Sequence, residues 1–87
     1  MKSIAIEETT IVLVEGHKVG MGNAVLQGDF QLPDGTACQG PACGLFWEDG
    51  DAWVGQGSEV VLFGVRYRVV SLDKQRGQLA TVVLERD

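Results

Sequence analysis

Turn-forming residues interrupt this chain so often that few stretches between turn signals exceed about ten residues. Twelve glycines are spread over its 87 residues, and strand formers dominate the apolar set, with twelve valines. Nowhere do apolar residues recur at helical spacing over the length that a helix needs. These features predict an all-β fold, a small antiparallel barrel or sandwich of about six to eight short strands.

The length fits a single domain, residues 1–87, without a separate catalytic or regulatory half. Glycine turns are expected at 15–17, 33–35, 49–50 and 74–77, and a turn-prone insert at 39–42. Strands are predicted near 3–7, 10–15, 18–31, 36–39, 43–48, 51–55, 58–63, 65–72 and 78–86. The first two could be one bent strand.

The first hairpin of the C-terminal meander, residues 58–86, has a register that the sequence defines. A two-residue turn at 63–64 pairs Val60 with Tyr67, so that the apolar partners share one face. Phenylalanine is a poor first residue for a type I′ turn. We therefore expect a type II turn with Gly64 at the positive-φ position, or a bulge.

The second hairpin of the meander follows if the loop at 74–77 has four residues. Val69 then opposes Val82, and Tyr67 opposes Leu84. The two registers, set independently, predict the same inner face. Its residues are Val60, Leu62, Val65, Tyr67, Val69, Ala80, Val82 and Leu84.

The outer face of this meander is expected to be mixed. Charged residues are predicted on it, but so are four apolar ones, Val61, Phe63, Val70 and Val83. A domain of this size has a thin stability margin, so further burial is valuable. We expect this face to form a homo-oligomer interface, in a dimer or tetramer, with burial beneath the N-terminal strands as the alternative.

Cys38 and Cys43 enclose a turn-prone Gly-Pro insert, which leaves three interpretations. They are two small apolar residues at a bulge, or a disulfide across a very short loop. A zinc site is the third, but with His17 the two thiols still lack a fourth ligand. We therefore predict no metal and no cofactor. His17, the only histidine, is expected to be an exposed turn residue.

The hairpin around residues 46–53 offers the one candidate binding site. Trp47 and Trp53 flank the acidic turn, and a register that pairs Phe46 with Trp53 places one tryptophan in the core and the other outside. Aromatic faces and carboxylates both attract cations. The candidate ligand-binding residues are Phe46, Trp47, Trp53, Glu48 and Asp51. The alternative is that the rings only cover a sheet or a subunit interface.

A net charge of −5 argues against nucleic-acid binding, which needs a basic surface, and it disfavours anionic membranes. No secretory signal is visible and no apolar run could span a bilayer, so the cytoplasm is the expected compartment. Gly16, Gly20 and Gly22 lack the context of a phosphate loop. No nucleophile–base pair, metal set or cofactor loop occurs, so no enzyme is expected.

The run from Gly57 to Val69 places a glycine, an alternating apolar strand, a glycine turn and a Tyr-x-Val strand in succession. It resembles the hairpin of SH3-like and related small β-barrels and covers about a third of the chain. As a whole the chain resembles the small orphan bacterial proteins carried on mobile elements such as integron gene cassettes. The expected function is a non-enzymatic, self-associating interaction module, with small-molecule binding as the alternative.

Overall fold

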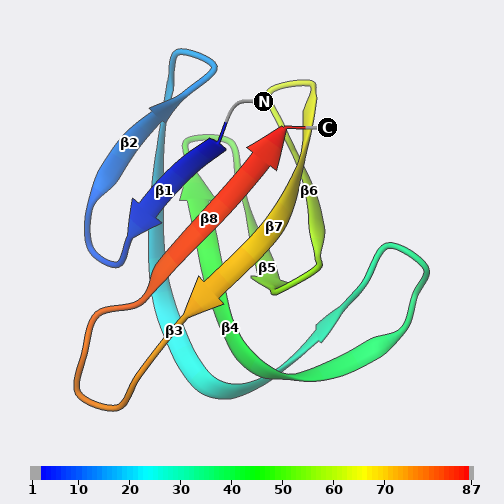
Figure 1. The fold of residues 1–87 in the computed structure, drawn as a ribbon. Coiled ribbons are helices and arrows are strands. Elements are labelled where there is room, and N and C mark those ends of the chain that lie inside the picture. The colour runs from blue at the N-terminus through cyan, green and yellow to red at the C-terminus, as the bar shows by residue number, and fades with distance from the viewer. Residues whose placement is uncertain (1–2, 87) are drawn as a thin grey trace.

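The computed structural model describes residues 3–86 as two four-stranded antiparallel sheets (Figure 1). The first sheet has the order β1-β8-β7-β6 and contains β1 (Ser3–Glu7), β6 (Glu59–Leu62), β7 (Val65–Asp73) and β8 (Thr81–Arg86). The second runs in sequence order through β2 (Ile11–Val14), β3 (His17–Gln31), β4 (Ala37–Trp47) and β5 (Gly50–Gly55). The predicted all-β fold is confirmed.

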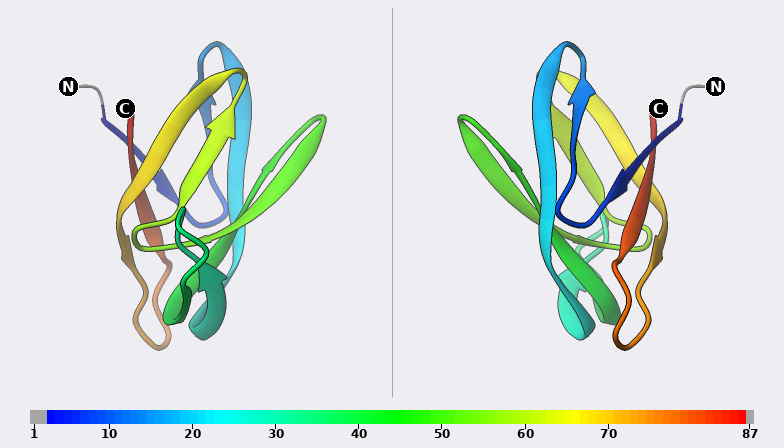
Figure 2. Two further views of the ribbon diagram at one scale, coloured as in Figure 1. Left: turned by 90° about the vertical axis from the view of Figure 1, so that its right-hand side faces the viewer. Right: turned by 90° about the vertical axis from the view of Figure 1, so that its left-hand side faces the viewer.

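The chain changes sheets twice, between β1 and β2 and again between β5 and β6 (Figure 2). The predicted strands 3–7 and 10–15 are therefore two strands in different sheets. The corner between them contains Thr9 with a φ of 69°, and Thr10 donates hydrogen bonds from its backbone and side chain to the Glu7 carbonyl. These contacts satisfy backbone groups where the chain leaves the ladder.

The core lies between the two sheets, where both contribute inward-facing side chains. Tyr67 is the largest fully buried side chain, and Ile6, Leu45 and Leu62 are equally inaccessible. All eight residues of the predicted inner face lie in this core except Val65, which is half-buried and packs against it. The alternation of inward-facing and outward-facing side chains along the C-terminal strands therefore identified most of the core residues of the C-terminal meander.

The predicted β6–β7 register is confirmed, with Val60 opposite Tyr67. The predicted turn was wrong, because Phe63 and Gly64 both have positive φ, 54° and 81°, as in a type I′ turn. A left-handed conformation costs a non-glycine residue about 1–2 kcal/mol. The Phe63 ring is stacked on His17 and meets Trp47 edge-on, and these contacts offset that cost.

The predicted β7–β8 register was wrong by two residues at Val69, which opposes Leu84 and not Val82, and by three residues from Ser71 to Asp73. The loop extends to Ala80, whose backbone N–H donates to Glu8 Oε1 at 3.0 Å and whose carbonyl accepts the Glu8 N–H. These bonds hold Ala80 outside the β7–β8 ladder. A register shift between Val69 and Ser71 then keeps Leu72 and Val82 in the core.

The predicted turn at 39–42 was also wrong, because β4 runs unbroken through it. Its partner β3 has register shifts between Gly22 and Val25 and between Val25 and Gly28, so the extra residues bend β3. Pro41 in β4 lies opposite this irregular segment of β3, where a missing N–H is tolerated.

Cys38 and Cys43 are both free thiols on that one strand. Five residues of strand correspond to roughly 16 Å, whereas disulfide-bonded cysteines have Cα atoms within about 7 Å. The structure therefore contradicts a disulfide between them, and they are the small apolar residues of the first interpretation.

The two thiols should react at very different rates. Burial, with a smaller contribution from the Glu8 charge, raises the pKa of Cys43 to about 12. About one Cys43 in ten thousand is then a thiolate at pH 8, whereas Cys38 is only half-buried. Iodoacetamide should alkylate Cys38 at least tenfold faster, as measured by peptide mass spectrometry, and both equally after unfolding. Equal native rates would contradict this structure.

The outer face of the first sheet differs from the predicted one in two respects. Val61 is exposed and Val70 and Val83 are half-exposed, but Phe63 leaves this face for the end of the sandwich. The N-terminal strands do not cover it, because β1 pairs beside β8 and β2 joins the opposite sheet. Within residues 3–86, nothing lies over Val61.

Candidate functional site

Three hairpin turns meet at one end of the sandwich (Figure 1). They connect β2 to β3 at 15–16, β4 to β5 at 48–49 and β6 to β7 at 63–64. Two of them come from the second sheet and the third comes from the first. Residues more than forty positions apart in the sequence therefore come together at this end.

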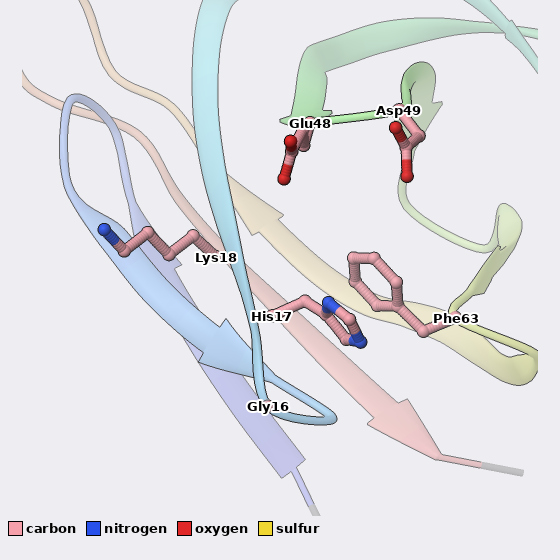
Figure 3. Close-up of a pocket in the computed structure, with 6 residues that line it drawn as sticks. All are labelled: Gly16, His17, Lys18, Glu48, Asp49 and Phe63. Atoms are coloured by element: carbon pink, nitrogen blue, oxygen red, sulfur yellow. The ribbon is translucent and has the colours of Figure 1, made fainter.

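A cavity of about 310 Å³ lies among these turns, and we call it the turn pocket. Figure 3 shows the Glu48 and Asp49 carboxylates extending from the β4–β5 turn toward the space beside the Phe63 ring. Lys18 points away from that space. The lining residues are Gly16, His17, Lys18, Glu48, Asp49 and Phe63.

The walls of the turn pocket are held by two ring contacts. The His17 and Phe63 rings stack with centroids 4.1 Å apart and an angle of 14° between their planes. Trp47 meets the Phe63 ring edge-on with centroids 6.3 Å apart. Each contact joins the second sheet to the β6–β7 turn, so the stack fixes how far the two layers separate here.

The register of the β4–β5 hairpin differs from the predicted one by two residues. Glu48 and Asp49 form the turn, so that Phe46 opposes Asp51, and Gly44 opposes Trp53. Gly50 was expected to supply a positive φ, but it lies in the strand. A Cβ there would be 3.2 Å from the Trp47 ring, so the glycine accommodates that side chain. This shift places both turn carboxylates at the pocket.

A second feature is the outer side of the second sheet, which carries the four most exposed of this sheet's large apolar residues. They are Ile11, Leu13, Phe46 and Trp53, which we call the apolar face. A shallow hollow of about 270 Å³ lies over Gly20, between Ile11 and Phe46. Because Gly20 has no side chain, this part of the face is both apolar and concave.

The two aromatic rings of the apolar face each reach over a neighbouring glycine. A Cβ on Gly44 would be 2.7 Å from the Phe46 ring, and one on Gly28 would be 3.2 Å from Trp53. The Trp53 indole Nε1 donates to the Asp29 carbonyl at 2.8 Å. The tryptophan is therefore fixed in orientation although it is exposed.

A polar cluster lies beneath the β2–β3 turn. The Tyr67 hydroxyl donates to the Glu15 carboxylate, and Arg86 Nη1 lies 3.7 Å from Glu15 Oε2. Burial raises the pKa of Tyr67, and the hydrogen bond and charge of Glu15 raise it further, whereas the Arg86 charge opposes the increase. The cluster ties the core tyrosine to the turn that leads into His17.

The structure separates the predicted ligand-binding residues. Glu48 lines the turn pocket, Trp47 supports its Phe63 wall, and Phe46, Trp53 and Asp51 lie on the outer side of the sheet. Sequence reasoning missed the contributions of His17, Lys18 and Phe63 to the pocket, because the signal depends on turns of two sheets meeting. The unbroken apolar run from Ile11 to Val14 is the signal that could have indicated a strand with two apolar sides, but it was not interpreted in this way.

Residues 3–86 contain no group of three or more histidine, cysteine or acidic side chains that could hold a metal. In the same part of the chain, no helix is long and apolar enough to cross a membrane. No protein-family model matches the chain, and neither does any curated protein or solved structure. The structure thus defines a class, the small all-β domain, and two candidate surfaces within it.

Proposed function

We propose that this protein is a non-enzymatic interaction module that forms a homodimer through its apolar face. The observation that carries the proposal is the concentration of exposed apolar residues on one side of the second sheet. Monomeric proteins seldom expose large contiguous apolar patches without a functional reason. A second copy of the chain is always present at the same concentration as the first. It is therefore the partner that is always available to bind this face.

The size of the apolar face fits a dimer interface. Exposed fractions of 68, 66, 39 and 45% for Ile11, Leu13, Phe46 and Trp53, at roughly 200 Å² per side chain, leave on the order of 440 Å² uncovered. About 60% of the surface in a protein interface is apolar. An apolar patch of this area therefore corresponds to an interface of roughly 700 Å² on each copy. Stable interfaces typically bury about 800 Å² on each partner.

The shape of the apolar face suits packing against an identical sheet. Gly20, Gly22 and Gly44 keep the centre of the face low, and the hollow over Gly20 can accept an apolar side chain of the other copy. Two sheets pack face to face at about 10 Å, with their side chains interdigitated. Trp53 is already fixed in orientation, which lowers the entropic cost of binding.

The face also carries both signs of charge at its border. Lys18 on β3 is opposite Leu13, and Asp51 on β5 is opposite Phe46. A twofold arrangement presents the same surface twice, so a face with a base and an acid can complement itself. The outer face of the first sheet, on which the sequence predicts the interface, has Val61 as its one large exposed apolar residue among residues 3–86.

Two matched substitutions distinguish the faces. Leu13 is 66% exposed and opposite Lys18, and Val61 is 59% exposed and opposite Arg66. Leu13→Glu and Val61→Glu therefore each place a carboxylate in an exposed strand position across from a base. We expect Leu13→Glu to convert the dimer to a monomer in light scattering after size-exclusion chromatography, with at least a hundredfold weaker association, and Val61→Glu to leave the dimer intact.

The reverse pattern would assign the interface to the first sheet, and a monomeric parent protein at 100 μM would remove the proposal. The circular dichroism spectrum of each variant controls for folding. We also propose a cytoplasmic location, which the sequence predicts. Carriage on a mobile element stays a prediction.

A further inference from the structure

We propose that the Phe46 side chain of each copy packs into the hollow over Gly20 of the other copy, so that two identical contacts form about the twofold axis of the dimer. This inference rests on the proposed function, because it requires that two copies meet through the apolar face. It adds which side chain fills the hollow, and therefore how the two sheets lie relative to each other.

Gly20 is a glycine that the fold of a single copy does not require. Six of the twelve glycines have a positive φ, and at four others an added Cβ would be 3.2 Å or less from a neighbouring side chain. A Cβ on Gly20 would meet only the Thr10 carbonyl oxygen at 3.6 Å and Ile11 Cγ1 at 3.8 Å, which are ordinary contacts. Gly22 is equally unrestricted, but the Phe46 ring of its own copy already covers it at 3.5 Å. Since a glycine inside a strand often marks the close approach of another group, Gly20 points to a group from outside the copy.

The hollow over Gly20 has apolar walls on both sides. Ile11 on β2 and Phe46 on β4 are its cross-strand neighbours, and both are exposed. Lys18 and Trp47 complete the lining of this space of about 270 Å³. A second apolar face packed over the hollow without filling it would leave a cavity, which is destabilising. The dimer therefore needs an apolar side chain of the other copy at this point.

The position of the twofold axis decides which side chain this is. When two identical sheets pack face to face, the axis lies in the plane between them. An axis parallel to the strands and midway between β3 and β4 places β2 of one copy over β5 of the other, and β3 over β4. The whole apolar face is then between the sheets. An axis midway between β2 and β3 would leave Phe46 and Trp53 uncovered.

The axis between β3 and β4 brings Phe46 to the hollow. Gly20 and Phe46 are opposite each other on these two strands, so the rotation exchanges their positions. Phe46 of each copy therefore lies over Gly20 of the other. An axis perpendicular to the strands through this pair would place Gly20 over Gly20, and the two hollows would face each other unfilled. The first arrangement is the one that leaves no cavity.

The same axis suits the charges at the border of the apolar face. Lys18 lies two residues before Gly20 on β3, and Asp51 is opposite Phe46 on β5. The rotation places Lys18 of one copy over the β4–β5 hairpin of the other, diagonally across from Asp51, a step that a long side chain can span. Both residues are exposed, and the ion pairs formed within residues 3–86 involve neither of them. The arrangement that fills the hollow therefore also brings opposite charges together.

Two substitutions test the contact from its two sides. Gly20→Leu fills the hollow, and the spacing around Gly20 leaves room for its Cβ within one copy. Phe46→Ala removes the side chain that enters the hollow. Each variant alone should associate at least tenfold more weakly than the parent protein, the first through overpacking and the second through lost apolar contact. Val61→Ala truncates an exposed apolar residue of the first sheet and should leave association unchanged.

A mixture of the two variants gives the decisive measurement. In their heterodimer, Phe46 of the Gly20→Leu copy meets Gly20 of the Phe46→Ala copy, as in the parent protein. At the second contact the introduced leucine meets the introduced alanine, so a large and a small side chain have changed places. The heterodimer should therefore be at least tenfold more stable than the geometric mean of the two homodimers. Native mass spectrometry resolves the three dimers by mass and measures their proportions.

Independent effects of the two substitutions would give the heterodimer the geometric mean itself, and this result would overturn the proposal. A contact between residues 20 and 46 of the same copy is averaged in the same way, so it cannot produce the excess. The circular dichroism spectrum of each variant controls for folding. If Gly20→Leu does not fold, Gly20→Val takes its place, because valine is well suited to a strand.

The outcomes also separate this inference from the function on which it rests. A monomeric parent protein would remove both. A dimeric parent protein whose Leu13→Glu variant is monomeric, with a heterodimer at the geometric mean, would retain the dimer through the apolar face and overturn only the placement of Phe46. An excess of the heterodimer supports both.

Discussion

Replacing Gly55 with alanine should lower the free energy of unfolding by about 3 kcal/mol, because there is no room for a side chain at this position. A Cβ on Gly55 would be 2.4 Å from two carbon atoms of the Phe30 ring and 2.5 Å from a third, so it meets the ring's face and not its tip. Phe30 is buried, and neighbouring Ser58 ties β5 to β3 through hydrogen bonds with Gly55 and Gln31. The ring must therefore leave its site.

Thermal unfolding measures this effect directly. For a domain of this length, about 3 kcal/mol corresponds to a decrease in Tm of roughly 15 °C. Gly44→Ala is the matched control, because its Cβ would approach only the end of the exposed Phe46 ring, and it should cost less than about 1 kcal/mol. In a Phe30→Ala background, Gly55→Ala should cost almost nothing. Additive losses would show that the ring is not what excludes the side chain.

Replacing Tyr67 with phenylalanine should lower the free energy of unfolding by about 2 kcal/mol at pH 7, because hydrogen bonds to charged groups contribute roughly 1.5–3 kcal/mol. The substitution removes the hydroxyl that donates to Glu15 and leaves the buried ring in place. Glu15→Gln retains an acceptor and should cost less. Urea unfolding measures both, and a neutral Tyr67→Phe substitution would show that this hydrogen bond adds nothing to stability.

The same residue predicts a loss of stability in alkali. The pKa of Tyr67 is raised in the folded protein, chiefly by burial, so its contribution is fully present below the unfolded value of about 10 and is lost as pH rises through the folded pKa. Cys43, with its raised pKa, adds to this loss, so the Tyr67→Phe protein should show a smaller but still measurable decline.

Tyr67 is the only tyrosine, so the ultraviolet absorbance of the phenolate reports this group alone. It should titrate above pH 10 in the folded protein and near its ordinary value in urea. A folded titration at the ordinary value would contradict the burial of the hydroxyl end of the ring.

The fold was predictable because alternation of side chains along a strand survives errors in register. The β4–β5 register and the β7–β8 register up to Val69 were each wrong by two residues, and a shift of two leaves every side chain on its own face. Beyond the register shift between Val69 and Ser71, the β7–β8 register was wrong by three residues. Val69 and Leu84 were therefore assigned to the core correctly, although their partners were not. The errors in register arose where a residue distant in sequence forms hydrogen bonds with the loop. Glu8, for example, forms hydrogen bonds with the backbone N–H and carbonyl of Ala80.

The candidate site was less predictable, because it depends on contacts between turns. Phe63 was assigned to an outer face by alternation, but its positive φ turns it toward His17. No local sequence pattern predicts a contact between residues 17 and 63, because this contact depends on how the two sheets pack against each other. The apolar face was easier to approach, since Phe46 and Trp53 were expected on one side of a hairpin.

The pairing of β1 with β8 has a consequence for how the protein acquires its structure in the cell. Ser3 lies opposite Glu85, and Ile6 packs with residues of the last strand. Because β1 is synthesised before β8, its backbone cannot be paired until β8 has also been made. Until then the apolar side chains of β1 lack their neighbours on β8, and the four-stranded sheet is complete only after residue 86 has left the ribosome.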